Sequence, residues 1–251
     1  MYIDTHCHLS IEDYDDISMI IEENRRAGIE NIIISGCTRE SIIESLSYAN
    51  QYADVYVTIG YHPSEALITT YSDIQLLEEQ IKNKKVVGIG EIGLDYHYGK
   101  EDMSQQQLLF RRQLAMADRH HLPVVIHSRD ATEDTINILK EFPNVKGDIH
   151  CFSGSLETAN IYISMGYYLG IGGVVTFKNS KLYSVIENIG LDSIVLETDS
   201  PYLTPEPNRG KKNSSKYIPD IAKRLAEILS ISEEDVSKIT LANTYRLFDF
   251  K

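Results

Sequence analysis

The chain has 251 residues, a length that matches one α/β barrel domain and does not require two domains. Its composition, 42% hydrophobic and 24% charged, excludes a disordered or low-complexity protein. The formal net charge of −13 excludes a broad basic surface for duplex phosphate, so a nucleic-acid substrate would need bound divalent cations to reverse the local field.

The N-terminal residues, MYIDTHCHLS, contain no basic region followed by an apolar one, and no later stretch approaches about eighteen uninterrupted apolar residues. We therefore expect a cytoplasmic protein that does not associate with membranes. The cysteines, Cys7, Cys37 and Cys151, are odd in number and form no C-x-x-C pair. Reduced thiols are expected rather than disulfides or a thiolate zinc site.

Eight short apolar runs rich in β-branched residues predict strands. In chain order they cover residues 2–5, 31–34, 55–59, 86–89, 124–126, 147–149, 167–171 and 194–196. The segments between them have helical periodicity, for example 105–121 after a cap at Ser104 and the stretch to Leu139 after a cap at Asp130; the last helices are expected near 218–229 and 233–245. Alternating strands and helices predict parallel βαβ units, so we expect a single (β/α)8 TIM barrel domain over residues 1–251.

Active sites of such barrels lie at the carboxyl ends of the strands. The first predicted strand continues as Asp4-Thr5-His6-Cys7-His8, and because strand side chains alternate between faces, His6 and His8 can point to the same side. An isolated pair of this kind is also compatible with structural histidines that are hydrogen-bonded.

Four later strands are followed by further potential metal ligands. They are Glu91 in GIGEIGLDY, His127 in VIHSRD, His150 in DIHCFSG and Asp199 in VLETDSP. Each could by itself be an ordinary ion-paired or hydrogen-bonded residue. Ligands at the ends of strands one, four, five, six and eight would converge, however, and imidazoles with carboxylates favour zinc, manganese, iron or other first-row cations over an all-oxygen magnesium site. The sequence therefore predicts a metal site.

These motifs, in their order along nearly the whole chain, resemble those of the TatD family of metal-dependent deoxyribonucleases. They are D-x-H-C-H-L at 4–9, G-E-I-G-L-D-Y at 90–96, H-S-R-D-A at 127–131, H-C-F-S-G at 150–154 and E-T-D-S-P-Y-L-T-P at 197–205. The resemblance implies the barrel fold and two divalent metal ions, with Zn, Mn, Mg, Fe and Ni all compatible. It implies that His6, His8, Glu91 and Asp199 hold one ion and Glu91, His127 and His150 the other.

The resemblance also implies catalytic roles for two carboxylates. Glu91 would bridge the ions, in the place that a carboxylated lysine takes in related amidohydrolase barrels. Asp199 would bind metal and accept a proton from the attacking water.

Further residues have two possible interpretations each. His62, in a G-x-H-P segment that resembles the family's, could contact a substrate phosphate or could cap the turn before Pro63. Asp95, Arg129 and Asp130 could orient ligand imidazoles or form ordinary ion pairs.

The basic cluster at 208–213 includes Arg209, Lys211 and Lys212, which could bind a phosphodiester backbone or belong to a solvated loop. The family usually continues this segment as R-G-K-R-N-E-P. Here Ser214 and Ser215 replace the acidic residue and the proline, which puts any family role of those two positions in doubt.

The predicted activity is metal-dependent hydrolysis of DNA, exonucleolytic with a preference for single-stranded ends, by a monomer without an obligate protein partner. The alternative keeps the metals and changes the substrate to a small amide, ester or aminoacyl bond, because fold and metals do not determine chemistry. A non-catalytic protein on a decayed barrel would lack ligands, and none is lacking.

Overall fold

The computed structural model describes residues 1–97, 99 and 101–250, and its strands follow the predicted order. They are β1 (Tyr2–Cys7), β2 (Ile29–Gly36), β3 (Val55–Ile59), β4 (Val86–Asp95), β5 (Val124–Arg129), β6 (Gly147–Ile149), β7 (Tyr168–Ile171) and β8 (Ile194–Leu196). Neighbouring strands in the sheet are consecutive in the chain, from β1 to β8, and the pairs β1/β2, β3/β4, β4/β5, β5/β6 and β7/β8 are parallel. This is the strand arrangement of a (β/α)8 barrel, which confirms the predicted fold class.

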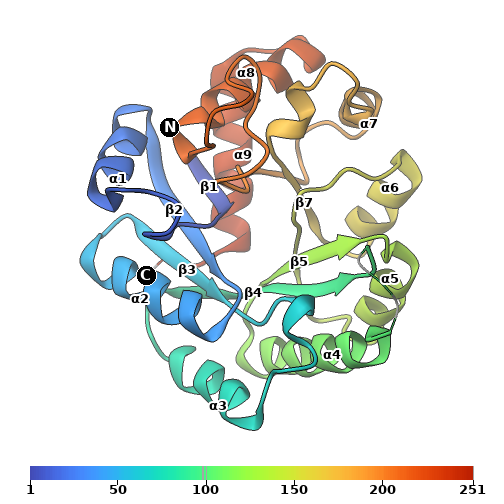
Figure 1. The fold of residues 1–251 in the computed structure, drawn as a ribbon. Coiled ribbons are helices and arrows are strands. Elements are labelled where there is room, and N and C mark those ends of the chain that lie inside the picture. The colour runs from blue at the N-terminus through green and yellow to red at the C-terminus, as the bar shows by residue number, and fades with distance from the viewer. Residues whose placement is uncertain (98, 100, 251) are drawn as a thin grey trace. The chain divides into compact units, whose positions relative to one another are not determined.

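Helices follow the strands along the chain (Figure 1). They are α1 (Ile17–Arg26), α2 (Arg39–Gln51), α3 (Tyr71–Gln80), α4 (Met103–His120), α5 (Thr132–Lys140), α6 (Leu156–Ser164), α7 (Leu182–Ile189), α8 (Ile218–Leu229) and α9 (Glu233–Leu247), with short 3-10 helices η1 (Pro63–Glu65), η2 (Gly173–Thr176) and η3 (Ser215–Tyr217). Helices α2 and α3 begin with capping boxes at Thr38 and Thr70. Within the described ranges, no helix combines the length and apolarity needed to cross a bilayer.

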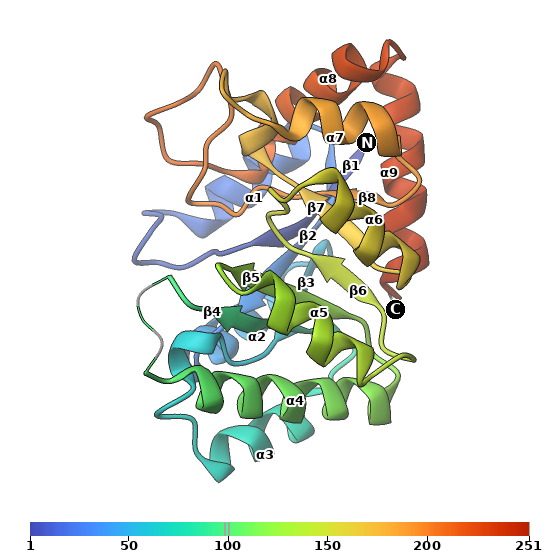
Figure 2. The same ribbon diagram turned by 90° about the vertical axis from the view of Figure 1, so that its right-hand side faces the viewer.

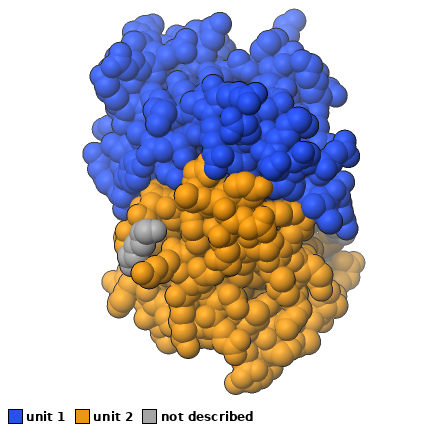
Figure 3. Space-filling view, turned by 90° about the vertical axis from the view of Figure 1, so that its left-hand side faces the viewer, with its two compact units in different colours: residues 1–34, 150–247 blue, residues 35–149, 248–251 orange. Residues whose placement is uncertain are grey.

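The chain divides into two compact units, coloured separately in Figure 3. Unit 1 comprises residues 1–34 and 150–247, and unit 2 comprises residues 35–149 and 248–251. In unit 1, α8 and α9 pack against each other and against β1 and β8 (Figure 2). In unit 2, α2 packs against β3 and α4 against β4. A single domain over residues 1–251 stays a prediction.

Strands β4 and β5 are longer than predicted, because pairing between them continues past the apolar runs. Gly93 pairs with His127 and Asp95 with Arg129. The close approach requires glycine at position 93, which has φ +143° and where a Cβ atom would collide with the carbonyl oxygen of His127. Glu91 and His127 therefore lie within their strands rather than after them.

The two predicted helix caps are each displaced from the observed ones. Helix α4 has Asp102 at its N-cap instead of Ser104, and α5 has Ala131 instead of Asp130. Asp130 has a left-handed backbone conformation, with φ +54°, and its carboxylate pairs with His97. Asp130 therefore does not cap α5. The predicted caps at these positions are wrong, whereas the predicted start of α8 at 218 and of α9 at 233 are confirmed.

Asn243 of α9 connects that helix to the beginning of β8. Its fully buried amide nitrogen donates to the carbonyl oxygens of Leu191, at 2.7 Å, and Ile194, at 2.8 Å. We expect Asn243→Ala to lower the free energy of unfolding by about 2–3 kcal/mol, because two buried acceptors lose their donor.

Urea unfolding followed by circular dichroism measures this change. Asn188→Ala is the matched control, because its exposed amide donates only to Ser184 within α7, and it should shift stability by no more than about 0.5 kcal/mol. Equal midpoints for the two variants would contradict the proposed role of Asn243.

Candidate metal centre

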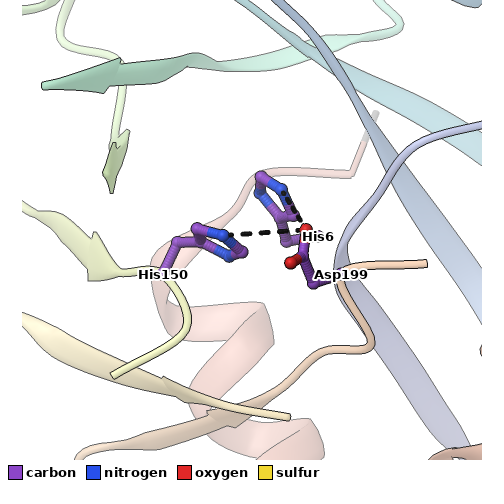
Figure 4. Close-up of side chains that lie close together, drawn as sticks. All are labelled: His6, His150 and Asp199. Carbon is purple, nitrogen blue, oxygen red and sulfur yellow. Dashed lines mark ion pairs between the residues drawn. The ribbon is translucent and has the colours of Figure 1, made fainter. Parts of the chain in front are cut away.

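Unit 1 brings three histidines to one carboxylate oxygen. Figure 4 shows His6, from β1, and His150, which follows β6, beside Asp199, which follows β8. The Nε2 atoms of His6, His8 and His150 lie 3.7, 3.5 and 3.8 Å from Asp199 Oδ1. His6 and His150 are buried, and their rings stack with centroids 3.7 Å apart. The four predicted ligands of this unit therefore converge.

The spacing within this cluster fits a bound cation. His6 Nε2 and His8 Nε2 lie 3.2 Å apart. Two imidazole nitrogens that bind one tetrahedral zinc ion at about 2.0–2.1 Å are separated by about 3.3 Å. Imidazole lone pairs and a carboxylate at these distances suit zinc, manganese or iron, so this donor set can hold a metal.

A buried carboxylate orients His150. Glu197, which is fully buried, lies with Oε2 3.1 Å from His150 Nδ1, and its Oε1 accepts the backbone N–H of Cys151 at 2.7 Å. Burial raises the pKa of Glu197, and the nearby His150 opposes this effect. When the imidazole proton lies on Nδ1, facing Glu197, the Nε2 lone pair faces Asp199.

A second buried carboxylate joins the segments that carry the ligands. Asp4 accepts the backbone N–H of Thr198 at 3.0 Å and its hydroxyl at 2.6 Å, together with the backbone N–H of His6 at 3.3 Å. Burial raises the pKa of Asp4 to about 7, although hydrogen bonds from Thr198 and Ser215 oppose the rise. The backbone N–H of Asp199 also donates to His6 O at 3.0 Å, so both ligand segments are held in register.

Unit 2 contains a cluster of its own residues on β4 and β5. His127 lies between two carboxylates, with Nδ1 2.7 Å from Glu91 Oε1 and Nε2 3.1 Å from Asp95 Oδ2. The Cys37 thiol donates to Glu91 Oε2 at 3.5 Å. Burial disfavours the ionised form of Asp95, but hydrogen bonds from His127 and from the His97 backbone outweigh it and lower the pKa. When the neutral imidazole of His127 donates its one N–H to Asp95, the lone pair of its other nitrogen faces Glu91. This arrangement suits a cation held by His127 and Glu91.

His62 follows β3 and caps η1. Its Nδ1 accepts the backbone N–H of Ser64 at 3.2 Å, and its ring lies edge-on to His127 with centroids 4.6 Å apart. Because Nδ1 accepts, the neutral ring carries its proton on Nε2. His62 and Asp95 both line a cavity of about 280 Å³. The predicted turn cap is present, and phosphate binding by His62 stays a prediction.

Of the residues expected to orient ligand imidazoles, Asp95 contacts His127 directly. Arg129, at the exposed end of β5, acts on Asp95 through its positive charge, which helps to lower the pKa of that carboxyl. Asp130 forms an exposed ion pair with His97 at 2.9 Å. His97 is not a predicted ligand, so this contact supports the ion-pair interpretation of Asp130.

The side chains of the basic segment are exposed and have partners within unit 1. Arg209 stacks over the ring of Phe177 at 3.9 Å, and Lys211 Nζ donates to Asn208 Oδ1 at 2.9 Å. Lys212 Nζ donates to the carbonyl oxygen of Asp13. Phosphate binding by Arg209, Lys211 and Lys212 stays a prediction.

The end of the same segment is buried. Asn213 Nδ2 donates to the carbonyl oxygens of Thr198, at 2.9 Å, and Tyr202, at 2.5 Å. Ser214 Oγ donates to Asn24 Oδ1 at 3.1 Å, and Ser215 is hydrogen-bonded to Asp4. The two serines that replace the family's acidic residue and proline are thus internal hydrogen-bonding groups, Ser214 toward Asn24 and Ser215 toward Asp4.

Sequence reasoning did not assign roles to Asp4 and Glu197. Each stands two residues before a predicted ligand, Asp4 before His6 and Glu197 before Asp199. For Asp4 that spacing was a usable signal, because residues two apart on a strand share a face, whereas Glu197 and Asp199 lie after β8. Their burial and their partners come from segments far away in the chain.

Comparisons with known proteins agree with this fold and with a metal-dependent hydrolase. A sequence profile of the family described as TatD related DNase matches residues 3–249. A Bacillus subtilis (strain 168) protein named uncharacterized metal-dependent hydrolase YabD is 42% identical over 252 residues, which is 99% of each chain. The crystal structure of YjjV, a TatD homologue from Escherichia coli K12, has a TM-score of 0.90 at 31% identity over 98% of this chain and 97% of that one. A TatD family hydrolase from Entamoeba histolytica has the same fold, with a TM-score of 0.88 at 24% identity over 100% and 98% of the two chains.

Replacement of Glu197 should weaken metal binding without removing any proposed ligand. We expect Glu197→Gln to lower zinc affinity by about 10–100-fold, because the amide no longer holds the His150 proton on Nδ1. Competition with a chromophoric chelator measures the affinity. Glu187→Gln, an exposed change on α7, is the charge-matched control and should bind zinc like the unaltered protein. An affinity of the Glu197 variant equal to that of this control would refute the orienting role.

Proposed function

The chain belongs to the family of TatD-related DNases and is a metal-dependent hydrolase, and we propose that it cleaves phosphodiester bonds of DNA. The observation that carries the proposal is the convergence of three imidazole nitrogens on Asp199 Oδ1. The substrate in this proposal is a single-stranded end, degraded exonucleolytically by a cytoplasmic monomer. The net charge of −13 disfavours extensive contact between the protein and a continuous DNA duplex, which supports a strand end as the substrate.

The proposal assigns the six predicted ligands to two divalent cations. His6, His8 and Asp199 would hold one cation and His127 and His150 the other, and both would share Glu91. When bound, the cations supply a water acidic enough to attack near neutral pH and offset the negative charge of the phosphate. The protein's contribution is to hold these ligand atoms in position.

The chain's own residues then have distinct tasks. Asp199 holds the proton released by the attacking water on its carboxylate. Glu197 and Asp95 keep His150 and His127 in the orientations that their hydrogen bonds define. His62 would donate its Nε2–H to a nonbridging phosphate oxygen; the acceptance of the Ser64 N–H by Nδ1 supports a proton on Nε2.

The proposal is tested by a substrate panel. Metal-free protein reconstituted with single metals should be offered labelled single-stranded DNA, duplex DNA, RNA and a set of small amides, esters and aminoacyl compounds. Metal-dependent shortening of single-stranded DNA from one end is the expected result. Hydrolysis confined to the small compounds would establish the amidohydrolase alternative instead.

Two carboxylate replacements should abolish most of the activity. We expect Asp199→Asn and Glu91→Ala each to lower turnover of single-stranded DNA at least about a hundredfold, because they remove the proton acceptor and the shared ligand. Gel-resolved product formation measures turnover, and circular dichroism verifies the fold. The exposed changes Asp192→Asn and Glu79→Ala serve as matched controls. Near-normal turnover by folded Asp199→Asn would exclude Asp199 as the proton acceptor.

The basic segment should contribute to DNA affinity. Replacing Arg209, Lys211 and Lys212 together with Ala should weaken DNA binding, and each lost phosphate contact should reduce the log–log salt slope by about 0.7 for a single strand. Fluorescence anisotropy at several salt concentrations measures both quantities, and metal content should not change.

The control for this variant removes the same charge elsewhere. Lys82, Lys84 and Lys146 are exposed and precede strands β4 and β6, so their joint replacement with Ala lowers the net charge equally without altering the segment. If both triple variants bind DNA with the same affinity and slope, the segment has no specific role in phosphate binding.

A further inference from the structure

Tyr202 is an aromatic residue exposed close to the metal ligands of unit 1. It stands three residues after Asp199, and 61% of its surface is accessible. Its ring centroid lies 6.4 Å from that of His8, with the two rings inclined at 65°. An exposed ring of this size gains little from packing in the core, so burial does not explain its position.

The backbone that carries Tyr202 is held by several hydrogen bonds. The N–H of Tyr202 donates to Asp199 O at 2.9 Å, and its carbonyl oxygen accepts Asn213 Nδ2 at 2.5 Å. Asn213 is fully buried, and its own carbonyl oxygen accepts the Tyr14 hydroxyl at 2.7 Å. The fold therefore keeps the Tyr202 backbone at a set distance from Asp199, although the ring itself is exposed.

The segment that presents this ring also carries exposed cations. Arg209 and Lys211 lie between Tyr202 and Asn213 in the sequence, in a chain whose net charge is −13. A segment that carries both an exposed aromatic ring and positively charged groups has the combination with which proteins bind single-stranded nucleic acid, since bases stack on the ring and phosphates meet the cations.

We propose that Tyr202 stacks on the nucleobase next to the phosphodiester that the His6, His8, His150 and Asp199 cluster engages. This inference rests on the proposed nuclease function and deepens it, because it names the residue that recognises the unpaired terminal nucleotide. A base in a duplex must lose its pairing and stacking before it can stack on a protein side chain, so a single-stranded end is preferred. Every base has an aromatic face, and little sequence preference follows.

The test compares substrates with and without a terminal base. Steady-state kinetics of Tyr202→Ala, Tyr202→Phe and the unaltered protein should be measured on single-stranded oligonucleotides with a normal or an abasic terminal nucleotide. Tyr202→Ala should raise KM about tenfold on the normal substrate and leave KM on the abasic one unchanged. Tyr202→Phe should behave like the unaltered protein, because it keeps the ring.

Tyr183→Ala is the control for loss of an exposed tyrosine, since Tyr183 is 44% exposed on α7 of the same unit. It should leave KM unchanged on both substrates. An equal rise of KM for Tyr202→Ala on the normal and abasic substrates, or no rise on either, would overturn the stacking proposal.

A binding measurement separates this proposal from the proposed function. Oligonucleotides with 2-aminopurine at either terminus can be titrated with metal-free protein, because stacking on a tyrosine ring quenches their fluorescence. Quenching that is kept in Tyr202→Phe and lost in Tyr202→Ala, in a protein that cleaves no DNA with any metal, would refute the nuclease function and sustain the stacking. Absence of binding, or quenching that persists in Tyr202→Ala, would overturn the stacking even if DNA is cleaved.

Discussion

The buried contact between Asp4 and Thr198 is the interaction on which the unit 1 cluster depends. A carboxylate without access to water is costly unless donors surround it, and Asp4 receives them from the backbone and hydroxyl of Thr198 and from the backbone of His6. Its donors lie one residue before Asp199 and at His6 itself. The contact that satisfies the buried carboxylate is therefore the same contact that holds together the segments of two proposed metal ligands, His6 and Asp199.

The two units orient their histidines by the same physical device. In unit 1 Glu197 faces Nδ1 of His150, and in unit 2 Asp95 faces Nε2 of His127. Each carboxylate determines which ring nitrogen carries the proton, and the other nitrogen then turns its lone pair toward a ligand carboxylate. The two units use opposite ring nitrogens, Nδ1 of His150 and Nε2 of His127.

The segment after β8 has an exposed part and a buried end. Asn213 and the following serines are buried, and Asn213 supports the backbone of Tyr202 while Ser215 supports Asp4. Arg209 and Lys211 are exposed. Replacement of the family's acidic residue and proline by serines is thus compatible with the fold, because small hydroxyls find acceptors in the interior. The chemical diversity of such barrels arises in segments of this kind, which vary while the strands remain.

The sequence alone determined the strand order, the fold class and the identities of the residues that form both clusters, because apolar periodicity and motif order are local properties. Only the tertiary structure decided which of them meet. The extension of β4 and β5 depends on the pairing of Gly93 with His127, and the roles of Asp4 and Glu197 depend on partners that other segments supply. Lys212 likewise turns to the carbonyl oxygen of Asp13, 199 residues away. Hydrogen bonds between distant segments leave no periodic trace in a sequence, so burial and partnership could be known only from the folded chain.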